Sequence, residues 1–211
     1  MKKTILVLII IFGNEINSQS ILYKKKFKET TTFQRDENNK IVFYEIINID
    51  TIERKYLYEN ALIWLKSTLV EKNDKITFEN ELMGTIEGES GFMVYVPSII
   101  SHMPHGKISY KVQLEIKEKK YRYYFSDFIF QYYQQDRRDF KYKPVKSALK
   151  PLEKEKYMGS QNAWNAHKVT VKETIDGQIA NLKLQMAKKP LVFIEIKKDS
   201  VIKPIIKTKD W

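Results

Sequence analysis

The sequence predicts an α+β fold in which a curved, five-stranded antiparallel sheet carries two helices on one face. Four strand-like segments between residues 75 and 133 follow one another with short turns, which favours an antiparallel meander. Segments of helical period precede and follow this block, and each has one apolar stripe that needs sheet surface. We therefore expect the order β-α-β-β-β-β-α.

Length and composition set the broad class. The chain has 211 residues, of which 43% are hydrophobic and 30% charged, and these values exclude wholesale disorder and polytopic membrane proteins. The absence of Cys excludes thiol catalysis, disulfides, zinc-thiolate sites and Cys-anchored lipidation. We expect one ordinary domain, without a cofactor.

The N-terminus has the pattern of a secretory signal peptide. Lys2 and Lys3 precede an apolar run over residues 5–12 that is too short to span a bilayer, and small Ser18 and Ser20 follow. We expect residues 1–18 to be removed and the mature protein to be periplasmic or extracellular, with cleavage after Ser20 as second choice. The alternative is a buried N-terminal element. The remaining chain divides into an arm (19–39), a domain (40–187) and a basic tail (188–211).

The first strand and helix follow the arm. Residues 41–49 are apolar on both faces, which favours an interior strand. Asp50 and Glu53 have capping-box spacing, so we expect a helix over residues 52–70. Its apolar stripe has the spacing of one helix face and consists of Leu57, Ala61, Trp64, Leu65 and Thr68.

The meander comes next. After a short strand at 75–79, a long one at 83–97 contains several glycines that indicate bulges or curvature. Residues 98–107 read as a loop. The strand at 108–117 alternates strictly, so Val112 should face the helices and Gln113 the other side. In the strand at 121–133 the alternation slips near Ser126 and Asp127, which separates Phe125 from Phe128 and Phe130 unless a bulge realigns them.

The last third combines a connection with a helix. Residues 134–160 are polar, contain Pro144 and Pro151, and read as a long crossing connection. Asn162 could cap a second helix over residues 163–187. Gly177 inside that helix costs about 1 kcal/mol relative to Ala.

Several stretches resemble a known family. They are Lys40-Ile41-Val42-Phe43-Tyr44-Glu45, Leu57-Tyr58-Glu59-Asn60-Ala61-Leu62-Ile63-Trp64-Leu65, Gly84-Thr85-Ile86-Glu87-Gly88 and Lys119-Lys120-Tyr121-Arg122-Tyr123. Over roughly residues 27–187 the chain resembles secreted bacterial proteins described as a domain of unknown function with a TATA-box-binding-protein-like (TBP-like) fold. The resemblance implies a curved five-stranded sheet with two helices on one side, and it transfers no catalytic residue.

Candidates for catalysis and metal binding are weak. His102 and His105 could join a metal site, but no third ligand is evident, so ordinary loop histidines are the simpler interpretation. Glu87 and Glu89 could serve an exported hydrolase only if one were desolvated, and nothing marks a pocket there. We expect no catalytic residue and no metal.

A basic-aromatic stretch over residues 121–125 raises the alternative of a nucleic-acid-binding half-saddle. The TATA-binding saddle, however, needs two copies of such a unit, and this chain has one. Packing within the sheet is the simpler interpretation, and a nucleic-acid partner is not expected.

The sheet face left uncovered by the helices is the main candidate for binding. Alternation predicts that it presents Met93 and five candidate ligand-binding residues, namely Tyr95, Lys111, Gln113, Arg122 and Tyr124. Rings beside cations and an amide suit an acidic glycan, a peptide or another envelope component, and the net charge of +11 points the same way. A solvated Lys-rich face or a homodimer surface is the alternative. The sequence thus favours an exported, non-enzymatic binding module.

Overall fold

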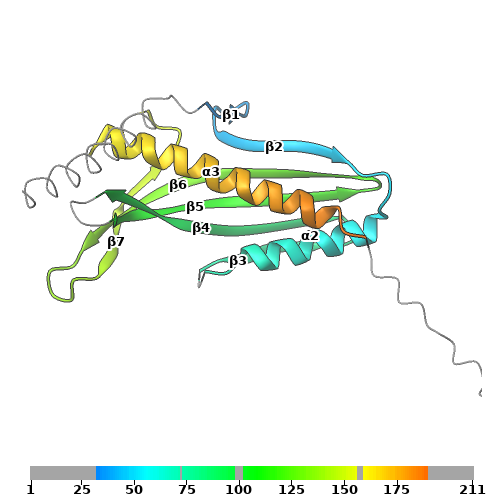
Figure 1. Ribbon diagram of the computed structural model, residues 1–211, viewed down its shortest axis with the longest axis horizontal. Coiled ribbons are helices and arrows are strands. Elements are labelled where there is room, and N and C mark those ends of the chain that lie inside the picture. The colour runs from blue at the N-terminus through cyan, green and yellow to red at the C-terminus, as the bar shows by residue number, and fades with distance from the viewer. Residues whose placement is uncertain (1–31, 72, 98–101, 156–158, 190–211) are drawn as a thin grey trace, which may run out of the picture.

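One antiparallel sheet with both helices on one face makes up the architecture of the computed structural model (Figure 1). The structure describes residues 32–71, 73–97, 102–155 and 159–189; the expected signal peptide and most of the tail lie outside them. The elements, in chain order, are β1 (Gln34–Arg35), β2 (Ile41–Asn48), α2 (Arg54–Thr68), β3 (Lys75–Asn80), β4 (Thr85–Pro97), β5 (His102–Lys117), β6 (Lys120–Gln135), β7 (Tyr142–Pro151) and α3 (Gln161–Met186).

The strand order is β1-β2-β6-β5-β4-β3, with β7 also paired to β6. The expected α+β class, with an antiparallel sheet and two helices, is confirmed. The five expected strands correspond to β2 through β6. Within the described residues, β1 and β7 raise the number of strands to seven.

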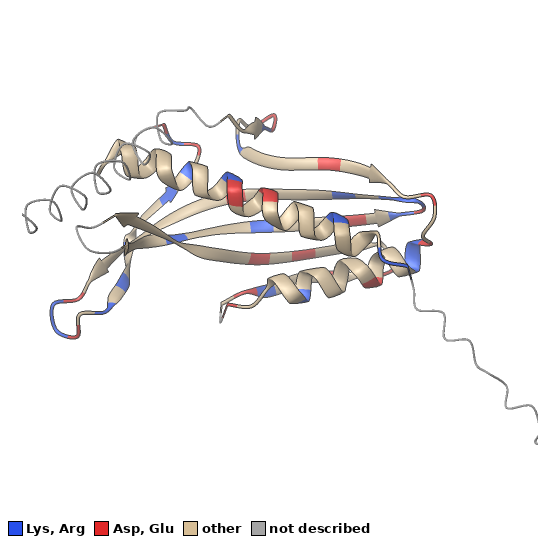
Figure 2. Cartoon of the chain, in the orientation of Figure 1, with Lys and Arg blue, Asp and Glu red and all other residues tan. Residues whose placement is uncertain are grey.

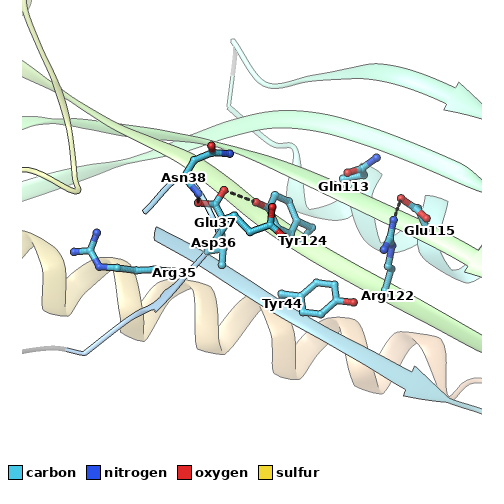
Figure 3. Close-up of a pocket in the computed structure, with 10 residues that line it drawn as sticks. Arg35, Asp36, Glu37, Asn38, Tyr44, Gln113, Glu115, Arg122 and Tyr124 are labelled. Atoms are coloured by element: carbon cyan, nitrogen blue, oxygen red, sulfur yellow. Dashed lines mark hydrogen bonds and ion pairs between the residues drawn. The ribbon is translucent and has the colours of Figure 1, made fainter. Parts of the chain in front are cut away.

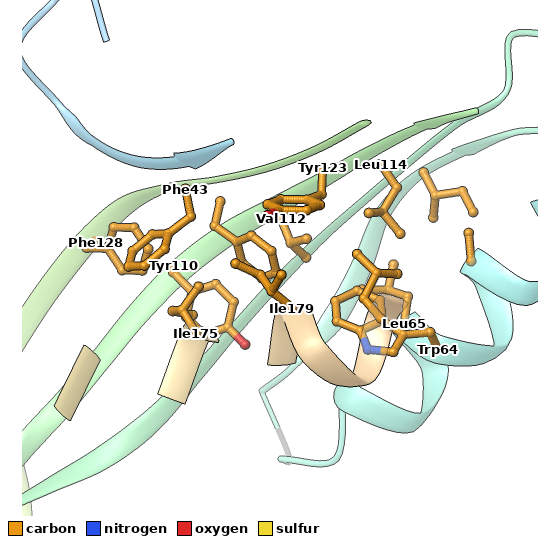
Figure 4. Close-up of a cluster of buried hydrophobic side chains, with 14 of the residues drawn as sticks. Phe43, Trp64, Leu65, Tyr110, Val112, Leu114, Tyr123, Phe128, Ile175 and Ile179 are labelled. Atoms are coloured by element: carbon orange, nitrogen blue, oxygen red, sulfur yellow. The ribbon is translucent and has the colours of Figure 1, made fainter. Parts of the chain in front are cut away.

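The alternation in β5 builds the centre of the core. Val112 is 2% exposed and faces the helices, whereas Gln113 is half-buried on the opposite face, as predicted. The other inward residues of β5 pack with neighbouring aromatic and aliphatic side chains of β6, α2 and α3 (Figure 4). Burial of these apolar side chains is the main force that holds the helices on the sheet.

A bulge in β6 restores the alternation that slips in the sequence. Asp127 has φ of +54°, and the register with β5 shifts between Ser109 and Lys111. As a result Phe125 and Phe128 both lie in the core with no exposed surface. An extra residue in one strand lets two side chains of opposite sequence parity face the same side.

Strand β2 corrects an expectation, because it is an edge strand along most of its length. β1 pairs only with Ile41 and Val42, whereas β2 pairs with β6 from Phe43 to Asn48. Ile46 is 52% exposed. The apolar character on both faces misled the assignment, because the open-face side chains of β2 are only partly covered.

Two segments expected to be irregular form strands. The prediction of a loop at 98–107 is wrong from His102 onward, where β5 begins. A Cβ on Gly106 would lie 2.2 Å from the carbonyl oxygen of Gln131, so this glycine allows the close approach of β6 and does not mark a turn. The expected crossing connection at 134–160 contains β7. Pro144 and Pro151 fit there because β7 pairs with β6 alone, and an edge strand tolerates residues that cannot donate.

The helices lie where they were expected, but their caps differ. Glu53 is the N-cap residue of α2 and makes no side-chain cap hydrogen bond, so the expected capping box is absent. Ser160 caps α3 instead of Asn162, and its hydroxyl accepts a hydrogen bond from the amide of Ala163 at 3.3 Å. Neither helix has the length and apolar character needed to cross a membrane, and no other helix occurs in the described part of the chain.

Candidate functional site

A cavity of about 490 Å³ lies on the open face, which is the sheet face opposite α2 and α3. The chain from β1 to the following turn forms one wall, and β2, β5 and β6 form the floor (Figure 3). Its lining consists of Arg35, Asp36, Glu37, Asn38, Val42, Tyr44, Gln113, Glu115, Arg122 and Tyr124. A short loop laid over a flat sheet thus makes the hollow.

The turn after β1 is organised by one carboxylate. Oδ1 of Asp36 accepts hydrogen bonds from the amides of Asn38 at 2.9 Å and Lys40 at 2.8 Å. Asn39 adopts φ of +60°, which Asn tolerates better than most residues, and its carbonyl accepts from Nη1 of Arg35 at 2.7 Å. These bonds hold the wall of the cavity in one conformation.

The same carboxylate joins the wall to the floor. The hydroxyl of Tyr124 donates to Oδ2 of Asp36 at 3.2 Å (Figure 3). Burial, followed by the negative charge of Asp36, raises the pKa of Tyr124 above its usual value. The ring of Tyr44 meets that of Tyr124 edge to face at 6.3 Å. Two aromatic rings therefore lie on the floor, and the phenol of Tyr124 stays protonated at neutral pH.

The polar groups of the floor are paired with one another. Nη2 of Arg122 donates to Oε1 of Glu115 at 2.5 Å, and this bond raises the pKa of the guanidinium. Nε2 of Gln113 donates to Oε1 of Glu87 at 3.1 Å. With two guanidinium groups and three carboxylates, the lining of the cavity has a formal charge of −1.

Similar ion pairs occur elsewhere on the open face. Asp127 accepts from Nζ of Lys40 at 2.6 Å and lies 3.2 Å from Nζ of Lys111, and both contacts lower its pKa. Glu89 lies 3.3 Å from Nζ of Lys75. Acidic and basic residues thus intermingle along the strands (Figure 2). Four cations of this face, Lys40, Lys75, Lys111 and Arg122, are thus each paired with a carboxylate.

The structure brings together three of the five candidate ligand-binding residues. Gln113, Arg122 and Tyr124 line the cavity. Lys111 lines a separate hollow beside Asp127, and Tyr95 lies beyond a register shift near the end of β4, outside the cavity. Met93 lies outside it too.

Sequence reasoning missed the wall, because the arm was expected to lie outside the sheet. The signal that could have located it is the turn at residues 37–40, between the arm and the first predicted strand. A hairpin there would have brought Arg35 and Asp36 beside the neighbouring strand.

The two histidines that were expected in a loop have different surroundings. His105 lies in β5, and its Nδ1 is 2.6 Å from Nε2 of His167 on α3, whereas His102 is exposed at the start of the strand. Sequence reasoning missed His167, which is 1% exposed. No group of three or more His, Cys, Asp or Glu side chains suited to a metal ion occurs among the described residues.

Comparisons with known proteins confirm the expected resemblance to a domain of unknown function with a TBP-like fold. Residues 43–131 match a family described as a domain of unknown function (DUF4468) with TBP-like fold. The chain resembles the crystal structure of a DUF4468 family protein from Bacteroides ovatus ATCC 8483, with a TM-score of 0.53 and 15% identity over 74% of this chain and 91% of that chain.

A TBP-like protein from Parabacteroides distasonis ATCC 8503 is similar to the chain as well, with a TM-score of 0.50 and 17% identity over 70% of this chain and 96% of that chain. No curated protein matches the sequence. At these identities the two structures show that the TBP-like fold is shared.

Proposed function

We propose that this protein, whose residues 43–131 match a family described as a domain of unknown function (DUF4468) with TBP-like fold, is an exported, non-enzymatic binding module of the bacterial cell envelope. It holds a neutral glycan in the open-face cavity. The observation that carries the proposal is the pair of rings, Tyr44 and Tyr124, beside paired charged and amide groups. Sugar rings stack on aromatic faces, and their hydroxyls both donate and accept hydrogen bonds.

The charges of the cavity favour a neutral ligand over the acidic one expected from composition. Arg122 is already bound to Glu115, and the carboxylates of the lining outnumber its cations. An anionic ligand would have to displace that ion pair and approach Asp36 and Glu37. The same carboxylates disfavour nucleic-acid phosphates.

Export is part of the proposal, and the N-terminal sequence supports it. Lys2, Lys3, the apolar run at 5–12 and the small residues after it have the order of a cleaved signal. Mass determination of the exported protein should give a mature N-terminus at Gln19 or Ile21. Retention in the cytoplasm with Met1 intact would contradict this part of the proposal.

Binding is tested with two double variants on the same face. Tyr44→Ala with Arg122→Ala removes a ring and a donor from the cavity, whereas the control, Tyr95→Ala with Lys111→Ala, removes the same kinds of group outside it. Both are measured against an array of neutral and acidic oligosaccharides, with circular dichroism to confirm folding. We expect the first pair to weaken binding about tenfold or more, as loss of an aromatic contact does, and the control to bind like the unmodified chain.

Equal affinity of both doubles for a bound oligosaccharide would place the ligand elsewhere. Binding confined to acidic oligosaccharides, or no binding to any of them, would refute the neutral glycan.

A further inference from the structure

The hairpin of β6 and β7 continues beyond the point where β6 stops pairing with β5. Pairing between β5 and β6 ends at Gly106 and Tyr132, and residues 133–135 pair with β7. Figure 1 shows the turn between these strands standing away from both helices. We call residues 136–141 the hairpin tip.

Phe140 presents an apolar ring at this tip. Its side chain is among the large exposed ones, at 73% exposure, and its backbone has φ of +56°. A bulky residue rarely adopts this left-handed conformation, so the backbone is strained there.

Hydrogen bonds hold the strained turn in place. The amide of Phe140 donates to the carbonyl of Asp136 at 2.9 Å, and Nε2 of Gln135 donates to the carbonyl of Phe140, also at 2.9 Å. The amide of Asp136 donates to the carbonyl of Lys141 at 2.8 Å. These hydrogen bonds hold the tip in a defined conformation in which the ring of Phe140 is exposed to water.

Cations surround this ring. Residues 136–146 contain five Lys or Arg and two Asp, a net charge of +3. Arg138 and Lys143 pair with Asp136 and Asp139 inside the turn. Arg137, Lys141 and Lys146 are exposed, and none of these three has an ion-pair partner within the described part of the chain. Figure 2 shows basic residues on both sides of the tip.

We propose that the hairpin tip anchors the protein on an anionic lipid surface, with Phe140 inserted at the level of the headgroups. An exposed ring between unpaired cations matches the two parts of such a surface, since the ring enters the apolar boundary and the cations meet the headgroup charge. The tip stands away from both helices, which favours an extended surface as the partner. This anchoring does not depend on the open-face cavity, and it would fix the orientation of that cavity relative to the lipid surface.

Phe140→Asn tests the ring without harming the turn, because Asn tolerates a positive φ. Leu82→Asn is the matched control, since Leu82 is 93% exposed in the β3–β4 turn, away from the hairpin tip. Both are measured by cosedimentation of the mature chain with vesicles of phosphatidylcholine alone or mixed with phosphatidylglycerol. We expect Phe140→Asn to lower partitioning onto the anionic vesicles about tenfold and Leu82→Asn to leave it unchanged.

A charge-matched pair tests the cations. Arg137→Gln with Lys141→Gln should lower partitioning onto anionic vesicles about 25-fold, since each cation near such a surface contributes about fivefold. Lys117→Gln with Lys119→Gln removes the same charge from the region of the β5–β6 turn and should have a much smaller effect. In a further variant, Phe140→Trp, indole fluorescence should shift to the blue on anionic vesicles.

Three results would overturn the proposal: no binding of the unmodified chain to anionic vesicles, equal losses for the two charge pairs, or unchanged binding of Phe140→Asn. The first would leave a soluble acidic partner as the explanation of the hairpin tip.

Discussion

Two imidazoles between β5 and α3 couple the helix to the sheet in a way that depends on pH. Their nitrogens lie 2.6 Å apart, so one ring donates and the other accepts, which requires a neutral ring. Phe130 stacks on His167 with a centroid distance of 5.2 Å, and the ring of Tyr132 lies 5.3 Å from that of His105. Burial, and next the neighbouring His105, lowers the pKa of His167 to about 3. Burial lowers the pKa of His105 too.

The sign of the pH effect follows from this depressed pKa. In the unfolded chain a histidine takes up its proton near pH 6.5, whereas folded His167 resists protonation until about pH 3. The contribution of neutral His167 to the stability of the fold is thus fully present above pH 6.5, and it is lost as the pH falls from 6.5 towards 3. We expect His167→Gln, which cannot be protonated, to reduce the loss of unfolding free energy between pH 7 and 4.5 by roughly 2 kcal/mol in urea titrations.

His102→Gln is the control for this prediction, because it makes the same substitution at an exposed position outside the histidine pair. Lys168, next to His167 along α3, lies over the ring of Trp164, and burial lowers its pKa. It remains identical in all variants compared. A pH profile of His167→Gln parallel to that of the unmodified chain would contradict the assignment.

At the scale of the element, α3 runs unbroken through a glycine. Gly177 is exposed, and a Cβ added there would meet nothing within 4 Å. Ala should therefore stabilise the protein by about 0.5–1 kcal/mol, because it restricts the unfolded chain and introduces no strain in the helix. Chemical denaturation followed by circular dichroism measures this change.

Gly91→Ala in β4 provides the contrast. Its Cβ would lie 2.6 Å from the carbonyl oxygen of Ile108, so this substitution should destabilise the sheet. If Gly177→Ala destabilised the protein as Gly91→Ala does, α3 would not be the continuous helix described.

For the whole molecule, the periodic parts of the fold were predictable and the strand edges were not. Strict alternation in β5 and the stripe of α2 both report burial on one side, and Val112 and Trp64 are buried as expected. β7 was not predicted, because proline and lysine are typical of loops, although an exposed edge strand accepts both.

The candidate site was predictable only in its floor. Alternation predicts the positions of Gln113, Arg122 and Tyr124. Each is next in sequence to a buried residue of its strand, so its side chain points to the open face. The wall around Asp36 is a local hairpin, but its position over the floor depends on the long-range pairing of β2 with β6, which no local pattern shows. The pairing of the cations likewise depends on cross-strand register, which composition does not contain.

The position of β2 has a consequence for the order of folding. Strands β4, β5, β6 and β7 join their neighbours through nearby turns, whereas Phe43 must find Phe125 across the intervening helix and three strands. Closing the longer loop costs more chain entropy, so β2 should dock after the meander has formed. In pulsed hydrogen exchange during refolding, amides of β5 and β6 that pair with each other should gain protection before those of β2; simultaneous protection would mean that β2 belongs to the nucleus. If β2 does dock last, the wall of the cavity is the last part to assemble, on a sheet that has already formed.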